Sequence, residues 1–435
     1  MTDNVNEREL VLSILLSVTR DEEYSHIAIK NVLEKYQYLE KNRRAFITRV
    51  SEGTLERMIE LDYIIDQFSK VPVRKMKPVI RNILRMGVYQ LKYMDSIPAS
   101  AACNEAVKLA ERKGFRNLKG FVNGILRNIS RNMNEISYPS REENPAAYFS
   151  IYYSMPEWIV KEWQKTYGTE MTEEMLQSFL REPELSIRTN ENRISPEELQ
   201  KRLTEEGVTV RKNEKLPYAF YLSGFDYLQA LPSFTEGLFY VQDESSMQVA
   251  ELAAPKDGDH VIDVCAAPGG KSIHIAEKMH GTGQVDARDL TPYKVGLIEE
   301  NMERCGTRNM TASCMDARIL DEASIEKADI VIADLPCSGL GVIQKKKDIK
   351  YKMTPEKQEM LVKLQQEILS VVHRYVKPGG TLLYSTCTIN REENEDNVAW
   401  FLKEHKEFLL ESMEQILPKQ GRNDGFFLAK LKKSE

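Results

Sequence analysis

The sequence lacks the cysteine and histidine spacings that mark common metal sites. Its six cysteines are scattered with no Cys-x-x-Cys pair, and its six histidines are isolated from one another along the chain. This pattern excludes zinc-finger and zinc-ribbon motifs, and we expect no metal ion. It also provides no disulfide framework, so we expect reduced thiols, as in cytoplasmic proteins.

Long hydrophobic segments are missing as well. The longest early apolar stretch, residues 10–18, is far shorter than a membrane span, and residues 1–7 are too polar and acidic for a signal peptide. We therefore expect a soluble cytoplasmic protein without a membrane partner.

Neither sign of charge dominates the 435 residues, whose net charge is −6. Within residues 70–131, however, 14 lysines and arginines stand against three acidic residues. Such a local excess of positive charge indicates a surface that binds phosphate groups.

The periodicity of apolar residues divides the chain into three parts. Residues 1–137 show helical spacing and predict an all-helical domain. Residues 146–245 mix short strands with helices and predict a small α+β module. Residues 246–435 alternate strands with helices and predict an α/β domain with a doubly wound, mostly parallel sheet. Its expected strands are 261–264, 283–286, 310–314, 330–333 and 381–384.

The first of these strands runs into a loop with two adjacent glycines, Gly269 and Gly270. Glycines allow a sharp turn and a close approach of the backbone to a ligand, and the following helix directs its first N–H groups at the loop. The spacing matches neither the dinucleotide fingerprint nor the triphosphate loop, so both ligands are disfavoured.

Three carboxylates occur at successive strand ends. Alone, each fits a helix N-cap equally well. Beside the glycine turn, they are placed to bind a ribose diol and an adenine amine. Together they predict a site for an adenosine with a sulfonium-bearing tail, lined by Asp286, Asp316 and Asp334.

Two cysteines each follow an expected strand. Cys337 lies in Asp-Leu-Pro-Cys-Ser-Gly, and Cys387 lies in Tyr-Ser-Thr-Cys-Thr. The C-terminal ends of parallel strands are where ligands bind. A cofactor loop and two strand-end thiols indicate nucleophilic attack on a base followed by group transfer.

These motifs resemble those of a known family. The segments DVCAAPGGKS, DLPCSGLGVI and YSTCTINREENE are similar to the signatures of RNA cytosine-5 methyltransferases that use S-adenosylmethionine. The helical N-terminal part, ending in GFVNGILRNI, resembles the RNA-binding antitermination factor NusB. With GFFLA at 425–429, almost the whole chain is similar to bacterial 16S rRNA cytosine-5 methyltransferases of the Sun/Fmu type. The resemblance implies a Rossmann-like methyltransferase domain behind a NusB-like domain.

The resemblance also implies roles for individual residues. Cys387 would be the nucleophile, Cys337 the base that helps release product, and Asp334, by its position, the group that assists protonation at ring nitrogen 3. The implied substrate is 16S rRNA, free or in an early assembly intermediate, methylated at cytosine 967 by a monomer. The cofactor S-adenosylmethionine would be held by Cys265, Ala266, Ala267, Pro268, Gly269, Gly270, Lys271, Asp286, Asp316 and Asp334.

A thiolate is needed because carbon 5 of cytosine is a poor nucleophile. Addition of sulfur at carbon 6 makes carbon 5 enamine-like, so that it accepts a methyl group before the carbon 5 proton and the sulfur leave. The base must be single-stranded or flipped out. We expect the lysines at 345–352 to hold phosphates near it, with Tyr351 a candidate for base stacking.

The sequence departs from the family pattern at Lys347, where proline is common, and at Ala287–Arg288, where an acid is common after Asp286. Two alternatives stay open. The same chemistry could act on a tRNA or on 23S rRNA, or the chain could be an antitermination-type RNA-binding factor with a vestigial catalytic half. The presence of both cysteines and of the complete glycine turn favours an enzyme.

Overall fold

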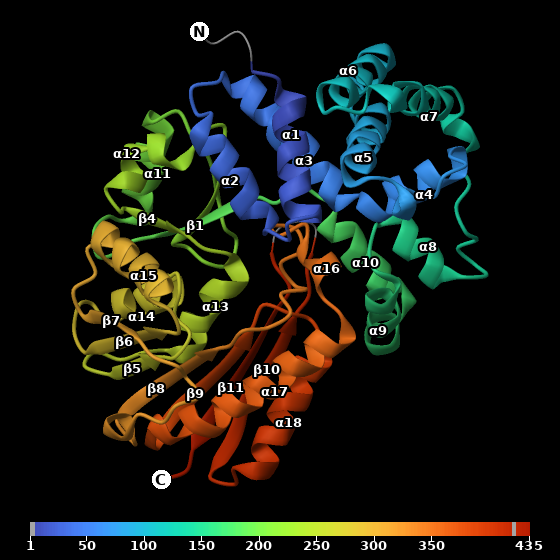
Figure 1. Ribbon diagram of the computed structural model, residues 1–435. Coiled ribbons are helices and arrows are strands. Elements are labelled where there is room, and N and C mark those ends of the chain that lie inside the picture. Colours follow the sequence, from blue (N-terminus) through green and yellow to red (C-terminus); the bar gives the residue numbers. More distant parts are fainter. Residues whose placement is uncertain (1–4, 420–422) are drawn as a thin grey trace. The chain divides into compact units, whose positions relative to one another are not determined.

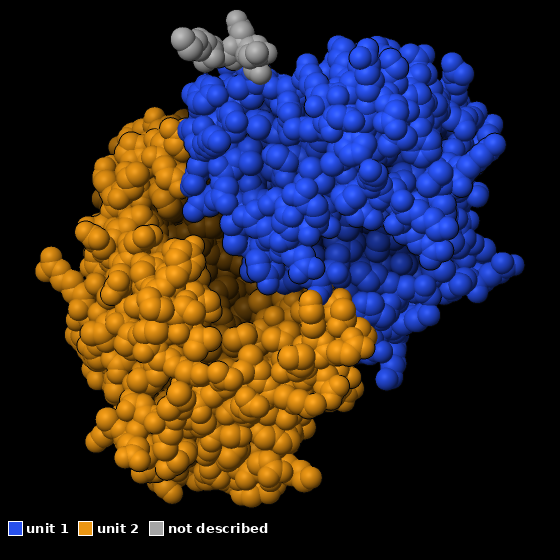
Figure 2. Space-filling view, viewed as in Figure 1, with its two compact units in different colours: residues 1–180, 343–352 blue, residues 181–342, 353–435 orange. Residues whose placement is uncertain are grey.

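The computed structural model describes residues 5–419 and 423–435, so the first four residues of the polar start lie outside the described part. The chain forms two compact units (Figure 2). Unit 1 comprises residues 1–180 and 343–352, and unit 2 comprises residues 181–342 and 353–435. This division groups residues 146–180 with the N-terminal helices. The boundaries of the three domains expected from the sequence stay a prediction.

Unit 1 is built from helices, as the sequence predicts for its N-terminal part. Buried side chains of the first and fifth helices face each other in its core, among them Leu12, Leu15, Ile83 and Val88. The helices, labelled in Figure 1, are α1 (Glu7–Thr19), α2 (Ser25–Lys35), α3 (Lys41–Glu56), α4 (Met58–Phe68), α5 (Pro78–Tyr93), α6 (Ala99–Arg112), α7 (Lys119–Arg131), α8 (Pro145–Tyr152), α9 (Glu157–Tyr167), α10 (Thr169–Phe179) and the short α16 (Ile349–Lys352).

Residues 343–352 are far from the other parts of unit 1 in the sequence, yet they are anchored on the end of α3. The buried Lys347 pairs with the carboxylate of Glu56. Lys350 Nζ donates to the backbone oxygen of Glu56 at 2.9 Å, and Tyr351 Oη donates to the same oxygen at 3.1 Å. Burial lowers the pKa of Lys350 to about 7.

The expectation that this lysine-rich segment holds RNA phosphates is therefore wrong for most of it. Lys347 and Lys350 are buried against unit 1, and Lys352 donates to the backbone oxygen of Glu23 at 2.7 Å. Tyr351 belongs to the same anchored segment and is half-buried, with its hydroxyl on the backbone of Glu56, and its stacking role stays a prediction. The departure from the family pattern at Lys347 has a structural use, since this lysine neutralises Glu56.

Unit 2 contains a small antiparallel sheet with strand order β2-β3-β1-β4. Its helix α11 (Pro196–Glu205) begins at a capping box formed by Ser195 and Glu198, which satisfies the first free amides of the helix. Ile187, Leu199 and Phe220 are fully or almost fully buried between sheet and helix. The remaining elements are β1 (Leu185–Thr189), β2 (Thr209–Lys212), β3 (Ala219–Ser223), α12 (Pro232–Thr235) and β4 (Phe239–Val241).

The larger sheet of unit 2 has seven strands in the order β10-β11-β9-β8-β5-β6-β7. Strands β5 to β9 are parallel, whereas β11 is antiparallel to both β9 and β10. The predicted doubly wound, mostly parallel sheet is confirmed, and the β10–β11 edge is an addition to it. The strands are β5 (His260–Asp263), β6 (Gln284–Asp289), β7 (Met310–Cys314), β8 (Ala328–Asp334), β9 (Val376–Thr386), β10 (Phe408–Ile416) and β11 (Phe426–Lys433).

Helices cover both faces of this sheet (Figure 1). Alternate residues of each strand point to opposite faces, so Val261 of β5 joins one apolar core and Ile262 joins the other. The first core includes α13 (Glu244–Ala253), α14 (Gly270–Lys278) and α15 (Pro292–Cys305), and the second includes α17 (Pro355–Val372) and α18 (Glu395–Glu404). The C-terminal strand ends are thereby left to form a site.

Within the described ranges, no helix has both the length and the apolar character needed to cross a bilayer.

We predict that Glu56→Gln destabilises unit 1 by about 3 kcal/mol, because it leaves the buried Lys347 without its counter-charge. The exposed neighbour Lys346 provides the matched control, and Lys346→Gln should change stability by less than about 0.5 kcal/mol. Denaturant unfolding of both variants measures the difference. Equal stability of the two variants would show that the segment is not held by this pair.

Candidate active site

The pairing of two parallel strands brings the two predicted cysteines together. Asp334 at the end of β8 pairs in register with Ser385 in β9, and Leu335 N donates to Ser385 O at 3.0 Å. Cys337 lies three residues beyond the end of β8, and Cys387 is the first residue after β9. Their sulfur atoms are 3.2 Å apart. The expectation that both cysteines follow strands is confirmed.

A buried carboxylate fixes the loops that carry the cysteines. Glu393 is 0% exposed, and its two oxygens accept hydrogen bonds from Ser338 N at 2.8 Å and Asn390 Nδ2 at 3.0 Å. Gly341 N also donates to Cys387 O at 3.0 Å. Glu393 lies in the stretch YSTCTINREENE, and its role is not predicted from the sequence. The only local signal is an acid with asparagines three residues before it and one residue after it, and the fold explains this spacing.

The thiol of Cys337 is strongly affected by its neighbour. The pKa of Cys337 is raised well above its usual value, first by its hydrogen bond with Cys387 and then by burial. Cys337 therefore keeps its proton at neutral pH, and its sulfur lies within hydrogen-bonding distance of the Cys387 sulfur. A protonated thiol is a poor nucleophile, so the role of nucleophile predicted for Cys387 is retained as a prediction.

Lys271 of the glycine loop brings a positive charge to the site of the two cysteines. Lys271 Nζ donates to Asp334 Oδ2 at 2.6 Å, while Ser385 Oγ donates to Asp334 Oδ1 at 2.7 Å. Burial lowers the pKa of Lys271, but Asp334, with smaller contributions from Asp263 and Cys387, outweighs burial, so the pKa is raised overall. An ammonium group within electrostatic reach of Cys387 stabilises a thiolate there.

The glycine turn has the close packing expected of a ligand loop. Gly269 has a φ of 102°, in the left-handed region that favours glycine, and α14 begins at the next residue. A Cβ on Gly270 would lie 2.9 Å from the ring of Tyr240. At the end of β5, Asp263 accepts from Ser272 Oγ at 2.5 Å, and burial raises its pKa to about 7. The predicted loop residue Cys265 is half-buried, and burial raises its pKa as well.

The prediction that Asp286 ends its strand is wrong. Strand β6 continues for three more residues, and the carboxylate of Asp286 is held by His260 Nε2 at 2.8 Å. This partner lowers the pKa of Asp286 to about 2. The strand ends instead at Asp289, whose Oδ2 accepts from Ala267 N of the glycine loop at 3.0 Å. Sequence reasoning missed Asp289 because it ended the strand too early.

The other predicted acids follow their strands as expected. Asp334 ends β8, and Asp316 lies two residues after β7 and pairs with Arg318 at 2.6 Å. The departure from the family pattern at Ala287–Arg288 results from taking Asp286 as the last residue of β6, where the structure has Asp289. Arg288 is buried and donates to Ser324 Oγ at 2.7 Å.

Comparisons with known proteins agree with this geometry. Residues 250–432 match the family model described as 16S rRNA methyltransferase RsmB/F, residues 5–131 match the NusB family, and residues 155–226 match the ferredoxin-like domain of RsmF/B-like methyltransferases. A protein of Bacillus subtilis named probable ribosomal RNA small subunit methyltransferase B is 36% identical over 98% of both chains. The chain belongs to the RsmB/F family of 16S rRNA methyltransferases.

Further relatives span the same length. A Synechocystis protein of the same name is 34% identical over 99% of this chain and 100% of its own. The crystal structure of PH0851 superposes with a TM-score of 0.83 and 27% identity over 99% of both chains. The structure of NSun6 from Pyrococcus horikoshii with SFG matches 64% of this chain and 98% of its own, with 25% identity and a TM-score of 0.59. Family membership confirms the resemblance drawn from the motifs.

We predict that iodoacetamide at neutral pH labels Cys387 before Cys337, because Cys337 retains its proton until well above its ordinary pKa of 9.0. Lys271→Met should slow the labelling of Cys387 by removing the neighbouring cation. The exposed Cys314 is the internal control and should react at an unchanged rate. Peptide mass spectrometry measures each site, and faster labelling of Cys337 would reverse the assignment.

Proposed function

We propose that the protein transfers a methyl group from S-adenosylmethionine to carbon 5 of a cytosine in 16S rRNA, through a transient bond between Cys387 and carbon 6. The observation that carries this proposal is the pair of thiols 3.2 Å apart at the ends of adjacent parallel strands, next to a lysine of the glycine loop. The names of the relatives support 16S rRNA as the substrate, and the location we infer from it is the cytoplasm.

The residues of the glycine loop suit S-adenosylmethionine. Tyr240 leaves no room for a side chain at Gly270, and Asp289 places a carboxylate beside the loop, where it can accept from a ribose diol. The P. horikoshii relative solved with SFG, an analogue of this cofactor, supports the choice. The bound cofactor would supply an electrophilic methyl group. We propose residues 265–271, Asp289, Asp316 and Asp334 as its contacts, with Asp289 in place of Asp286.

In the proposed reaction the sulfur of Cys387 forms a bond to carbon 6 of the cytosine, and the displaced electrons are taken up as nitrogen 3 gains a proton. The proposed source of this proton is the pair of Lys271 and Asp334, whose Nζ and Oδ2 atoms are 2.6 Å apart. Methylation of carbon 5 is followed by loss of its proton and by cleavage of the carbon–sulfur bond, which returns the electron pair to Cys387. Nitrogen 3 gives its proton back to the pair of Lys271 and Asp334 in the same step, so the product is neutral 5-methylcytosine.

The timing of the base follows from the coupling of the two thiols. Two of the causes that raise the pKa of Cys337, its hydrogen bond and its repulsion with Cys387, depend on negative charge at Cys387. That charge is consumed when Cys387 bonds to carbon 6. Adduct formation removes these two causes, whereas burial still raises the pKa. In the proposed sequence Cys337 therefore loses its proton more readily after the adduct has formed, and it then accepts the proton from carbon 5.

Unit 1 supplies the proposed surface for RNA phosphates. Of the 14 cations within residues 70–131, Arg85 is buried with Asp62 and Lys92 is tied to the buried Glu60. Eleven of the others are exposed: Lys70, Arg74, Lys75, Lys77, Lys108, Arg112, Lys113, Arg116, Lys119, Arg127 and Arg131. Lys108, Lys113, Arg116 and Lys119 form exposed ion pairs with acidic neighbours, which phosphate groups of RNA can replace. Cytosine 967 is the target that the family resemblance implies, and the RNA must present it unstacked.

We predict that Cys387→Ala abolishes transfer of labelled methyl groups to 16S rRNA. Cys337→Ala should instead accumulate a covalent RNA–protein adduct, because the carbon 5 proton is no longer removed and the sulfur cannot leave. Cys314→Ala is the control and should retain full activity. Denaturing gels and methyl counting on naked rRNA and on assembled subunits provide both readouts. Turnover by Cys387→Ala would remove this residue from the nucleophile role.

We predict that Asp289→Asn weakens S-adenosylmethionine binding about tenfold to a hundredfold, as expected when a carboxylate loses charged hydrogen bonds. Asp286→Asn is the matched control and should leave the affinity unchanged, since His260 already holds Asp286 within the strand. Isothermal titration calorimetry measures both. A loss confined to Asp286→Asn would restore the assignment made from the sequence.

We predict that replacing Lys119, Arg127 and Arg131 of α7 by glutamine weakens rRNA binding and flattens its salt dependence by about 0.7–0.9 per lost phosphate contact. Lys201→Gln, an exposed lysine of α11, serves as the control. Binding measured at several salt concentrations gives the slopes. An unchanged slope in the triple variant would exclude α7 from the RNA interface.

A further inference from the structure

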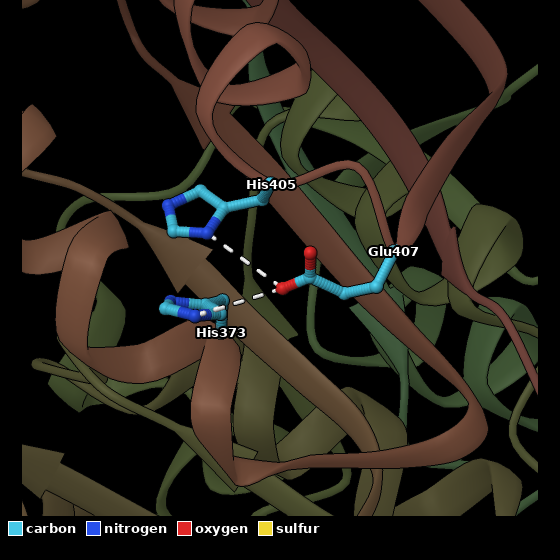
Figure 3. Close-up of side chains that lie close together, drawn as sticks. All are labelled: His373, His405 and Glu407. Atoms are coloured by element: carbon cyan, nitrogen blue, oxygen red, sulfur yellow. Dashed lines mark ion pairs between the residues drawn. The ribbon is translucent and has the colours of Figure 1, made fainter.

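Two histidines and a glutamate lie close together at the end of the large sheet where β9 and β10 begin. The thiols lie at the opposite end of β9. His373 precedes β9, His405 follows α18, and Glu407 precedes β10, whereas Cys387 follows β9. Figure 3 shows both imidazole rings turned toward one carboxylate oxygen. Glu407 Oε1 lies 3.7 Å from His405 Nδ1 and 3.9 Å from His373 Nε2. The chemistry proposed for the thiols uses none of these groups.

These separations are close to those around a small metal ion. Metal–nitrogen and metal–oxygen bonds of about 2.0–2.2 Å in tetrahedral geometry place neighbouring ligand atoms about 3.3–3.5 Å apart. One ligand atom from each of the three side chains lies within 4.8 Å of the other two. A modest contraction of the three side chains would therefore complete a three-ligand site, with a fourth position for water.

A hydrogen bond to the backbone orients His373 in a way that suits a metal ligand. Its Nδ1 is 3.0 Å from the backbone oxygen of Leu369, so Nδ1 carries the proton and Nε2 presents its lone pair to the cluster. A carbonyl behind an imidazole is the usual outer partner of a metal-bound histidine. The two imidazole centroids are only 3.9 Å apart, so two protonated rings would repel each other, whereas one shared cation satisfies both.

The cluster is apolar on one side and open on the other. The rings of Phe401 and Phe408 pack against His373 at 6.1 and 6.2 Å between centroids, and Phe401 lies 4.6 Å from His405. Glu407 is 43% exposed, so an ion can enter from solvent.

We propose that His373, His405 and Glu407 bind one divalent transition-metal ion of the zinc type. Two imidazoles and a carboxylate are the donor set that zinc accepts with an open fourth position. The ion would tie the ends of α17 and α18 to the start of β10, which pairs with β11 and forms one edge of the described sheet. The site departs from the expectation of no metal, because the fold joins residues that are isolated in the sequence.

The test uses the full chain after removal of metal, in a Cys337→Ser/Cys387→Ser background so that the paired thiols cannot take up zinc. Calorimetric titration with zinc chloride should give one ion per chain and raise the unfolding temperature. Glu407→Gln and His405→Gln should each weaken zinc binding at least about tenfold without changing the unfolding temperature of the metal-free protein. His280→Gln, at the exposed pair with Asp257, is the matched control and should bind zinc as the parent does.

Cobalt(II) identifies the ligands independently. The proposal expects visible d–d bands without a thiolate charge-transfer band, and it expects Glu407→Gln to change these bands. Zinc binding that Glu407→Gln and His405→Gln leave unaltered, a thiolate band, or no uptake of one ion per chain would each overturn the proposal. Cofactor binding and methyl transfer do not enter these readouts, so the metal site and the proposed function can fail separately.

Discussion

The alignment of β8 with β9 is the constraint on which the site depends. Because Asp334 pairs in register with Ser385, the loops that leave the two strands start side by side, and the sulfur atoms of Cys337 and Cys387 come within 3.2 Å. A shift of this register by one residue would turn Asp334 to the other face of the sheet. The buried carboxylate of Glu393 then holds both loops in place by accepting hydrogen bonds from Ser338 and Asn390.

Charge within this small space gives each group a different task. Lys271 is held by Asp334 within electrostatic reach of Cys387, while the hydrogen bond with Cys387 and burial keep the proton on Cys337. In the proposed reaction two chemically identical side chains act in succession as nucleophile and base. The order is set by burial and by coupling between the groups, with no need for the thiols to differ in sequence.

The sequence predicts what is encoded locally. Strand–helix alternation, the glycine turn and the two strand-end cysteines were all readable from short segments, and the fold confirms their positions. Asp286 was misjudged because a strand boundary is uncertain by several residues, which was enough to hide Asp289. The lysines near 347 were misread because their partner, Glu56, is remote in the sequence and becomes visible only in the folded unit. Glu393 and the histidine cluster depend on similar long-range contacts.

The identity of the atom that bonds to RNA is the most direct test of the account. A 16S rRNA fragment carrying 5-fluorocytidine should trap the adduct, because fluorine at carbon 5 cannot leave as a proton. After incubation with S-adenosylmethionine and digestion, mass spectrometry should find the methylated nucleotide attached to the peptide that contains Cys387. Attachment to the Cys337 peptide, or no attachment at all while ordinary RNA is methylated, would contradict the account.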